Sequence, residues 1–521
     1  MIDAKIGRLV HYRRGPTAKV PRTSTEFPLF LTARSAPRST VYAAARRGQL
    51  RPLAPGLFTS DVETPLEELV RERLLAIVST LYPGAVISDR SARSGGRPAE
   101  DGSLFIVHER TRETSLPGEI VIRPRHGAGP LEWDMPFVGE LWLASEPRAL
   151  LENAVLTRGR GPRVARTLTR TELEDWVESM LVQRGPEGLN GLRDRARVLA
   201  PQLEMAEQFQ LINGLIESAL GTRRARAHSP RLRARQRGQA YDPERLELFE
   251  QLRHALEERS PIVRPLLDPL SRRYRFLPFF EAYFSNYIEG TRFSVDEAVE
   301  IALHERIPAN RPADADDILG TYRIVSDPGE VSRIAQSTDD YLELLRRRHA
   351  VVLAGRPHKR PGEFKQERNE AGGLLFVDPG LVAGTLGHGF ELTRALTSAF
   401  ARAVFQMFVV SEVHPFDDGN GRVARIMMNA ELIAAGEHRI IIPSVYRNNY
   451  MMGLRGMSNN GHAEGLVASL DFAQRYTAAI DFSDLETARQ QLQETNALRE
   501  PDEEAAGLVR LELPAARRGS A

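Results

Sequence analysis

Residues 414–425, with the sequence HPFDDGNGRVAR, bring together side chains that phosphate chemistry requires. The segment holds a histidine, two adjacent carboxylates, two glycines on either side of an asparagine, and two arginines one helical turn apart. Histidine can accept a proton, and a carboxylate can hold a hard metal ion. Glycines let backbone N–H groups approach an anion, and arginines bind phosphates. We therefore predict a site that handles a nucleoside triphosphate rather than a structural loop.

Two buried helices are expected to position this segment. Apolar residues at helical spacing between Phe390 and Val413 predict one buried helix. It should end at His414, because Pro415 disfavours helical geometry in the residue before it. A second apolar helix is predicted from Arg422 to Ala435, followed by Gly436 as its C-terminal stop.

His414 and Asp418 are the predicted proton acceptor and metal ligand. Imidazole has an unperturbed pKa of ~6.5, which suits a general base at neutral pH. Asp418 lies between the histidine and the glycines, so its oxygen atoms could hold Mg²⁺ on bound phosphates.

Gly419 and Gly421 predict an anion site at the start of the second helix, where free N–H groups and the positive end of the helix dipole attract negative charge. Arg422 and Arg425 lie three positions apart on one helix face and could hold successive phosphates. Each feature alone is typical of a cap, a turn or a solvated helix face. Their combination favours a functional site.

The whole pattern resembles HPFx[D/E]GNGRxxR, the motif of Fic domain proteins, and every constrained position is present. The resemblance implies a mainly helical domain with a β-hairpin flap that uses ATP and Mg²⁺. Its implied activity is transfer of AMP to a serine, threonine or tyrosine hydroxyl of a target protein. The implied roles are proton removal by His414, Mg²⁺ binding by Asp418, an anion hole at Gly419, Asn420 and Gly421, β- and γ-phosphate binding by Arg422 and Arg425, and loop anchoring by Phe416. A kinase-like branch of the family has lysine in place of the second glycine, so Gly421 favours nucleotidyl transfer.

Residues 285–290, SNYIEG, are similar to the family's inhibitory motif and lie in an apolar helical run from about residue 276 to 290. The motif residues are Ser285, Glu289 and Gly290. The resemblance implies that Glu289 pairs with Arg425 and removes the γ-phosphate clamp. An ordinary helix C-cap is the alternative, since glutamate followed by glycine is common there. Some family members use this glutamate in removing AMP, and that role is left open.

Two further segments resemble parts of a Fic active site. Residues 361–369 and 372–380 predict a hairpin or flap, with a short strand at Leu374–Val377. Such an edge could add a segment of the target as a further strand, and a surface hairpin with no role is the alternative. Asn449 and Tyr450 are candidate nucleotide neighbours, although tyrosine in such a helix also suits core packing.

Composition restricts the classes of protein that remain. The chain has 521 residues, too many for one ordinary core, and it is 27% charged and 42% apolar. A net charge of +1 gives no overall bias toward nucleic acid, and the absence of cysteine excludes disulfides and thiolate chemistry. Neither a signal peptide nor a membrane-spanning stretch is recognisable, so we expect a cytoplasmic protein with no membrane partner.

The predicted organisation is multidomain, with an α+β N-terminal part and a mainly α C-terminal part. The expected boundaries are 1–65 for a winged helix-turn-helix-like domain, 66–220 for an α+β region, 221–240 for an exposed basic linker, 241–483 for the Fic catalytic domain, and 484–521 for a charged, partly disordered tail.

The N-terminal part resembles the winged helix-turn-helix start of AbiEi-type antitoxins. A short helix ended by Gly48, a Pro/Gly-rich wing at 49–59 and an amphipathic helix at Leu66–Leu81 carry this resemblance. Further strands are predicted near Leu104–Val107, Glu119–Ile122 and Phe137–Leu143.

If this domain binds DNA, its first helix should enter the major groove. The expected base contacts are Arg38, Ser39, Thr40 and Tyr42, and the expected phosphate contacts are Arg46, Arg47 and Arg51. The alternatives are a plain solvated face or a protein-binding surface.

Three hypotheses follow from the sequence. The leading one is a self-inhibited protein adenylyltransferase acting on a hydroxyl of a target protein. Within the same chemistry, the enzyme could use another nucleotide or remove AMP. A third hypothesis is a DNA-binding regulator or antitoxin whose Fic half senses nucleotide, and the intact His414 argues against it. Assembly into a homo-oligomer is left open.

Overall fold

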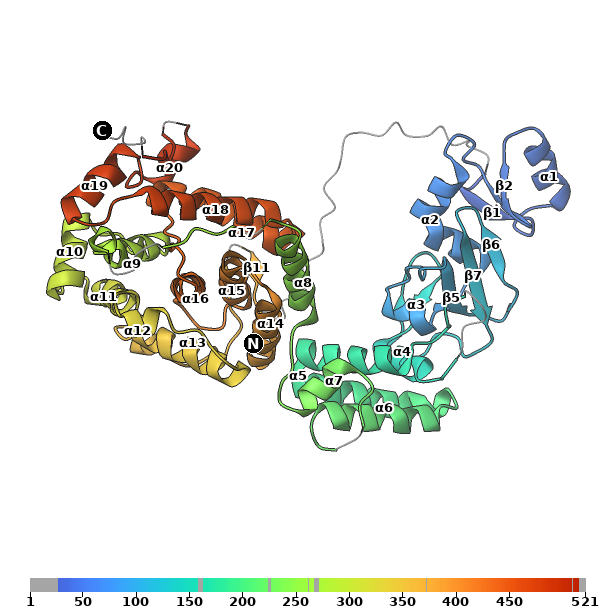
Figure 1. The fold of residues 1–521 in the computed structure, drawn as a ribbon. Helices are drawn as coiled ribbons and strands as arrows, with labels where there is room; N and C mark the ends of the chain where they lie inside the picture. Colours follow the sequence, from blue (N-terminus) through green and yellow to red (C-terminus); the bar gives the residue numbers. More distant parts are fainter. Residues whose placement is uncertain are drawn as a thin grey trace. The chain divides into compact units, whose positions relative to one another are not determined.

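A computed structural model describes residues 27–157, 163–223, 226–260, 262–266, 271–371, 373–507 and 509–514 (Figure 1). The chain divides into two compact units, Met1–Arg233 and Ala234–Ala521. Residues 1–26, on which the expectation of no signal peptide rests, lie outside the described residues. So do residues 515–521 of the expected tail. Within them, no helix is both long enough and apolar enough to cross a bilayer.

The first unit begins with a small sheet beside two helices. The strands are antiparallel in the order β1-β3-β2, and Gly56, with φ +81°, forms the turn of the β2–β3 wing. The predicted helix at 66–81 is confirmed with the same bounds. The elements are β1 (Phe30–Thr32), α1 (Arg38–Arg46), β2 (Arg51–Ala54), β3 (Leu57–Thr59) and α2 (Leu66–Leu81).

Helix α1 buries Val41 and Ala44 and exposes its polar side chains. The exposed residues include Arg38, Ser39, Thr40, Tyr42, Arg46 and Arg47. Arg51 behaves differently, because its Nε donates to the Asp61 carbonyl at 3.0 Å and its Nη2 donates to the Thr64 carbonyl. The expectation that Arg51 contacts phosphate is therefore wrong for this structure: local backbone groups use its guanidinium.

A mixed sheet with strand order β6-β7-β5-β4-β9-β8 forms the centre of the first unit. Strands β5 and β7 confirm two of the predicted strands. The third, Phe137–Leu143, is wrong over most of its length. Gly139, with φ +61°, turns the chain there, and Phe137 N–H donates back to the Leu141 carbonyl at 2.8 Å. The elements are β4 (Val86–Ile87), α3 (Asp89–Arg93), β5 (Ser103–Val107), β6 (Thr114–Leu116), β7 (Ile120–Arg125), β8 (Met135–Pro136), β9 (Trp142–Leu143) and α4 (Glu146–Asn153).

The expected exposed linker is partly a packed helix. Helix α7 (Pro230–Gln236) follows α5 (Arg170–Gln202) and α6 (Ala206–Ala219). Leu232 is buried, and Arg231 pairs with Glu178 of α5 at 2.6 Å. Glu174, also on α5, accepts the Ser229 N–H at 2.7 Å. Carboxylates on α5 thus neutralise and cap a segment whose composition alone suggested a solvated spacer.

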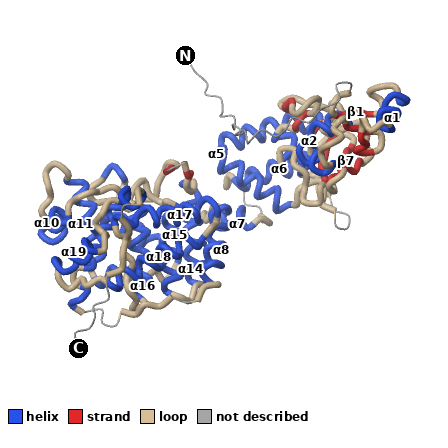
Figure 2. Tube along the Cα trace, turned by 90° about the horizontal axis from the view of Figure 1, so that it is seen from above, coloured by secondary structure: helices blue, strands red, loops and turns tan. Residues whose placement is uncertain are grey.

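The second unit is a helical assembly in which β-structure among the described residues is limited to one small hairpin and an isolated bridge between Pro265 and Glu437 (Figure 2). Its first half contains α8 (Pro243–Glu257), η1 (Arg272–Tyr274), α9 (Leu277–Ile288), α10 (Val295–His304), α11 (Pro312–Ser326), α12 (Pro328–Val331), α13 (Thr338–Val352) and η2 (Pro357–Lys359). The second half contains β10 (Glu370–Ala371), β11 (Leu374–Leu375), η3 (Pro379–Leu381), α14 (Val382–Ala395), α15 (Ala399–Val413), α16 (Asn420–Ala434), η4 (Ser444–Tyr446), α17 (Arg447–Asn460), α18 (Ala463–Ala479), α19 (Leu485–Glu494) and α20 (Pro501–Ala505).

The single helix predicted from Phe390 to Val413 is in fact two. The backbone becomes extended at Leu396, with ψ 132°, and ends α14. Ser398 then caps α15, because its Oγ accepts the Ala401 N–H at 3.3 Å. Buried residues continue through the break, so apolar spacing alone did not reveal it.

The charged C-terminal segment is packed rather than a free tail over its described part. Leu492, Ala497 and Leu511 are buried in one core cluster together with Phe280 of α9 and Tyr476 of α18. The expected domain end near residue 483 therefore falls inside the folded unit. The apolar positions of the segment are few, and they are hidden in sequence by the charges around them.

Candidate active site

The 414–425 segment joins α15 to α16 and includes the first residues of α16. His414 ends α15 in a left-handed conformation, with φ 51° and ψ 60°. Gly419, with φ +74°, precedes the first turn of α16. Both the end of the first helix at His414 and the glycine at the start of the second were predicted. The intervening residues form a short turn between two buried helices.

His414 is held as a neutral base. Its Nδ1 lies 3.2 Å from the Ser411 carbonyl oxygen, and its ring stacks on Phe376 with centroids 3.8 Å apart. Burial lowers the pKa of His414 to about 4. The bond to Ser411 requires a proton on Nδ1, so Nε2 carries the free lone pair in the neutral tautomer.

Asn420 fixes the turn through its side chain. Its Oδ1 accepts the Phe416 N–H at 2.8 Å, and its Nδ2 donates to the Phe416 carbonyl at 2.9 Å. Phe416 is fully buried and stacks on His349 with centroids 3.8 Å apart. The loop-anchor role expected for Phe416 fits this geometry. The amide of Asn420 is engaged with the loop, so Asn420 offers a phosphate only its backbone N–H.

The two glycines are needed for different reasons. A Cβ on Gly419 would lie 2.3 Å from Leu353 Cδ2, so close packing excludes a side chain there. A Cβ on Gly421 would lie 2.1 Å from Glu289 Oε1. No side chain caps α16, so its first N–H groups remain available for an anion. The Glu289 carboxylate thus lies directly over the predicted cradle.

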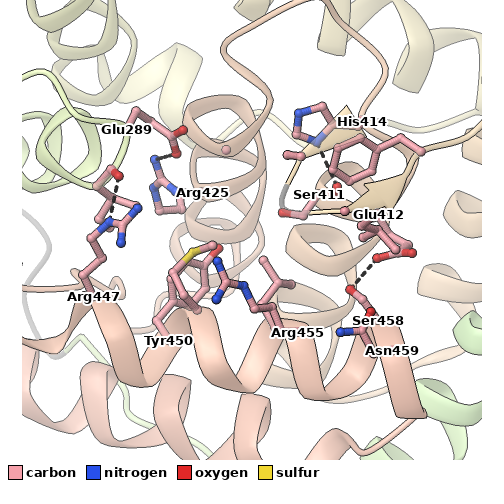
Figure 3. A pocket seen from close by; sticks show the side chains of 18 residues that line it. Glu289, Ser411, Glu412, His414, Arg425, Arg447, Tyr450, Arg455, Ser458 and Asn459 are labelled. Carbon is pink, nitrogen blue, oxygen red and sulfur yellow. Dashed lines mark hydrogen bonds and ion pairs between the residues drawn. The ribbon is translucent and has the colours of Figure 1, made fainter. Parts of the chain in front are cut away.

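Glu289 and Arg425 form the ion pair that the resemblance implied. Arg425 Nη2 lies 2.7 Å from Glu289 Oε1, and it also donates to the Ser285 carbonyl at 2.8 Å (Figure 3). Arg425 Nε donates to Ser285 Oγ at 3.0 Å. Burial pushes the pKa of Glu289 upward, but the Arg425 guanidinium outweighs it and holds that pKa below its ordinary value. Glu289 therefore stays ionised at neutral pH.

The alternative interpretation of residues 285–290 also describes the backbone correctly. Glu289 is the C-cap of α9, and Gly290 follows it with φ +93°. The helix end directs the Glu289 side chain toward α16. One residue thus both ends a helix and places a carboxylate on the cradle.

Arg422 was predicted to bind a phosphate, but its side chain does not line the pocket. Its Nη1 lies 2.8 Å from Asp317 Oδ2, and Arg422 is only 2% exposed. Asp317, on α11, also accepts two hydrogen bonds from Arg356 Nε at 3.0 and 3.1 Å. The sequence did not identify Asp317, because an isolated aspartate in a helix gives no signal of its long-range partners.

Asp418 suits a metal ion that arrives with the phosphates. Its Oδ1 accepts the Gly419 N–H at 2.6 Å and lies 3.5 Å from Arg422 Nη2, and 38% of its side chain is exposed. The neighbouring Asp417 pairs with Arg360. Among the described residues, no group of three or more metal-ligating side chains exists. One partly exposed carboxylate fits Mg²⁺, which often keeps waters and binds substrate phosphates.

A cavity of about 470 Å³, a size suited to a nucleotide, lies beside this turn, although Phe416, Asp418, Gly419, Asn420 and Arg422 do not line it. His414, Gly421, Arg425 and Glu289 line it, and α17 forms the opposite wall (Figure 3). Tyr450 lines the cavity as predicted, and burial raises the pKa of its phenol. Asn449 is exposed and absent from the wall, so its predicted place is wrong. Apolar parts of the wall come from Ile288, Leu374, Phe376, Met451 and Leu454.

The flap is a shorter hairpin than predicted. Only Leu374–Leu375 form the second strand, paired with Glu370–Ala371. Phe376 and Val377 leave the sheet, because Phe376 turns onto the His414 ring and Val377 is buried. Strand β11 was expected to offer an edge to a target segment, and in the structure one of its edges is already paired with β10.

Lys365 and Asn369 attach the flap to the turn at residues 414–419, and no role was predicted for either. Lys365 N–H donates to the Pro415 carbonyl at 2.8 Å, and its Nζ donates to Asn369 Oδ1 at 2.6 Å. Asn369 Nδ2 in turn donates to the Phe416 carbonyl at 3.0 Å. Burial lowers the pKa of the Lys365 ammonium to about 8. This ammonium also disfavours a second positive charge on His414.

Comparison with known proteins finds a similarity to Fic proteins within this unit. Residues 337–432 match the model of the Fic/DOC family. A Drosophila sechellia protein named Protein adenylyltransferase Fic is 30% identical over 242 residues, which cover 44% of this chain and 46% of the relative. The corresponding Drosophila willistoni protein is 28% identical over 256 residues, covering 46% and 49%. The chain thus spans about half the length of the curated relatives it matches.

Solved structures with a similar arrangement include Fic-1 from C. elegans, at 18% identity and a TM-score of 0.35. That match covers 59% of this chain and 96% of Fic-1. A Fic domain containing signaling protein from Bacteroides thetaiotaomicron also has 18% identity and a TM-score of 0.35, covering 47% and 97%.

Proposed function

We propose that the second unit is a self-inhibited protein adenylyltransferase that transfers AMP from ATP to a serine, threonine or tyrosine hydroxyl of a target protein. One observation carries the proposal. The Glu289 carboxylate lies on the glycine cradle at the start of α16 and pairs with Arg425, in the same cavity as the neutral base His414. An anionic group of the protein thus lies where phosphates would bind.

In the proposed reaction His414 Nε2 removes the proton from the target hydroxyl. The hydroxyl oxygen forms a bond to the α-phosphorus of ATP, the bond from that phosphorus to the bridging oxygen breaks, and pyrophosphate leaves. The N–H groups of α16 and the guanidinium of Arg425 stabilise the phosphate charge. Mg²⁺ carried by the phosphates would lie beside Asp418 and offset part of this charge.

Glu289 inhibits in this proposal by competing for one guanidinium. While Arg425 is paired with Glu289 and Ser285, it cannot hold the γ-phosphate of ATP. The triphosphate then lacks one of its binding groups, the Arg425 guanidinium, and the α-phosphorus is misaligned for attack.

The exposed edge of the flap is the proposed docking site for the target. Leu375, in β11, is 52% exposed, and Phe376 next to it lies against His414. A target segment that adds a strand at this edge, replacing the hydrogen bond from Arg245 to the Leu375 carbonyl, would place a hydroxyl near the base. Recognition through backbone groups fits an acceptor on an extended loop.

The position of the label decides between the alternative chemistries. A Glu289→Gly enzyme incubated with cell lysate should attach label to protein from ATP labelled at the α-phosphate but not from ATP labelled at the γ-phosphate. Mass spectrometry of the labelled peptides then identifies the modified side chain. Label from the γ-phosphate would mean phosphoryl transfer. Transfer from another nucleoside triphosphate alone would replace ATP as the donor, and loss of AMP from a modified protein by wild type would support the removal reaction.

A DNA-binding role of the first unit is a second candidate function, favoured by the side chains that α1 exposes. Tyr42 is 48% exposed and packs edge-on against Phe58 of the wing. Arg46 and Arg47 are exposed at the end of the helix. A helix with this exposed set beside a β-wing has the layout of a winged-helix reader, as the AbiEi-like resemblance implied.

Replacing Arg46 and Arg47 together by alanine should weaken DNA binding and flatten its salt dependence, because phosphate contacts release counterions. Fluorescence anisotropy with a duplex probe at several salt concentrations measures both effects. Arg51→Ala is the matched control, since Arg51 is bound to local carbonyl groups. If the wild-type chain has no affinity for duplex DNA at low salt, this second function is excluded.

A further inference from the structure

A buried ion pair lies behind the flap and has no part in the proposed chemistry. Arg245 Nη1, on α8, lies 3.1 Å from Glu412 Oε1, on α15. The Arg245 side chain is 13% exposed and that of Glu412 only 1%. Removing one partner of such a pair leaves a buried charge without its counter-charge, which is costly.

Arg245 also reaches the flap itself. Its Nη2 donates to the Leu375 carbonyl of β11 at 2.6 Å. Phe376 N–H already donates across the hairpin to the Asn369 carbonyl at 3.2 Å. Because backbone groups alternate in direction along a strand, the Leu375 carbonyl points to the outer edge. One side chain from α8 therefore holds the outer edge of the flap.

Glu412 connects the same pair to the opposite wall of the cavity. Its Oε2 accepts the Ser458 hydroxyl of α17 at 2.6 Å, and both residues line the cavity. The cluster of Arg245, Glu412, Ser458 and the Leu375 carbonyl thus joins α8, α15, α17 and the flap. We call this set the flap latch.

The hairpin of the flap is short. Its strands pair over only two residues each, Glu370–Ala371 with Leu374–Leu375. A hairpin of this size is not stable by itself in water. Lys365 and Asn369 secure the base of the flap at the catalytic turn, before the strands begin. The β11 end of the flap is therefore held by Arg245, which bonds Leu375, and by the stacking of Phe376 against His414.

We propose that Arg245 is a positioning residue that latches the flap over the nucleotide cavity. The latch keeps Phe376 on the His414 ring and the flap residues Ala371, Gly373 and Leu374 in the cavity wall. The consequence for nucleotide binding rests on the proposed function, because the cavity must be the one that ATP enters. The consequence for flap motion does not depend on the proposed function.

The test compares Arg245→Gln with Arg253→Gln. Arg253 lies on the same helix and pairs with the exposed Glu250 and Glu257, so its loss leaves the flap untouched. Both changes are made in the Glu289→Gly background, where the nucleotide site is open. Amide hydrogen exchange of the peptides spanning residues 370–378 measures flap motion, and calorimetry with Mg·ATP measures the dissociation constant.

Arg245→Gln should speed exchange in the flap by about tenfold or more, since a charge-assisted hydrogen bond to the strand is lost. It should also weaken Mg·ATP binding several-fold, while Arg253→Gln changes neither. Arg245→Lys, which can reach only one of the two partners, should give an intermediate exchange rate. If Arg245→Gln fails to fold, the Arg245→Lys comparison decides the matter.

Flap exchange equal to that of the Arg253→Gln control would overturn the latch. If exchange rises but Mg·ATP affinity is unchanged, the latch holds the flap without shaping the nucleotide site, and the proposal in its full form is wrong. A Glu289→Gly protein with intact Arg245 that binds no Mg·ATP would instead contradict the proposed function. The exchange data then still decide whether the latch exists.

Discussion

Replacing Glu289 by glycine should raise the rate of AMP transfer by about 10- to 100-fold, the range expected when a charge-assisted hydrogen bond no longer occupies a binding group. The change removes the competing carboxylate from Arg425, which keeps its hydrogen bonds to Ser285, and clears the space over Gly421 that the carboxylate now fills. Label incorporated from α-phosphate-labelled ATP, measured as an initial rate, reports the effect. Mild acidification should not mimic the substitution, because Arg425 holds the pKa of Glu289 below its ordinary value.

Glu258→Gly is the matched control for this experiment. Glu258 is also the exposed C-cap residue of a helix in the same unit, α8, and it does not line the cavity. Any general effect of glycine at a helix end should appear in both variants. Equal labelling by Glu289→Gly and wild type would remove the inhibitory assignment of Glu289.

Replacing His414 by alanine in the Glu289→Gly background should lower the transfer rate by roughly 10²- to 10⁴-fold, the usual contribution of a general base. Mg·ATP affinity should change little, because the cradle and Arg425 bind the phosphates. Rates and calorimetry on the same preparation separate the two effects. His414→Asn tests the backbone separately, since asparagine tolerates the left-handed conformation that His414 adopts.

The pH dependence follows from the lowered pKa of His414, which is about 4 in the folded protein and ~6.5 unperturbed. The base stays neutral at physiological pH, so the transfer rate should be flat there and fall only as pH drops toward about 4. The folded state also binds this proton less readily than the unfolded state. The free energy of unfolding therefore decreases as pH falls from ~6.5 toward about 4.

Loss of Mg·ATP affinity in both His414 variants would show that the histidine is structural.

The turn at residues 414–419 was predicted correctly, because the residues that form it act over a few positions in the sequence. Pro415 ends α15 at His414, and Gly419 supplies the left-handed residue before α16. Such constraints act within a few residues, so they are visible in a short motif. The approach of Glu289 to Arg425 was accessible only through a family resemblance, since the two residues are far apart in the chain.

Contacts between distant segments account for most of what the sequence missed. No residue near Arg422 in the sequence predicts its ion pair with Asp317. No residue near Lys365 predicts that Lys365 packs against the turn at residues 414–419. The packed helix α7 was mistaken for a linker for the same reason, because the carboxylates that neutralise it lie on α5. Charge composition describes a segment but not its partners.

Two errors came from patterns that permit more than one structure. Apolar residues continue from Phe390 to Val413, but Ser398 caps a new helix within the run. The run near Phe137 has strand-like composition, but Gly139 turns it back on itself. Periodicity identifies a buried face more reliably than it identifies where an element ends.

A crystal structure of the Glu289→Gly protein with Mg²⁺ and a non-hydrolysable ATP analogue would test the central claim most directly. We expect a triphosphate lying across the N-terminus of α16, with one phosphate on Arg425 and the α-phosphate on the side facing His414. A triphosphate bound elsewhere, with the space over Gly421 empty and Arg425 turned away from it, would contradict the account.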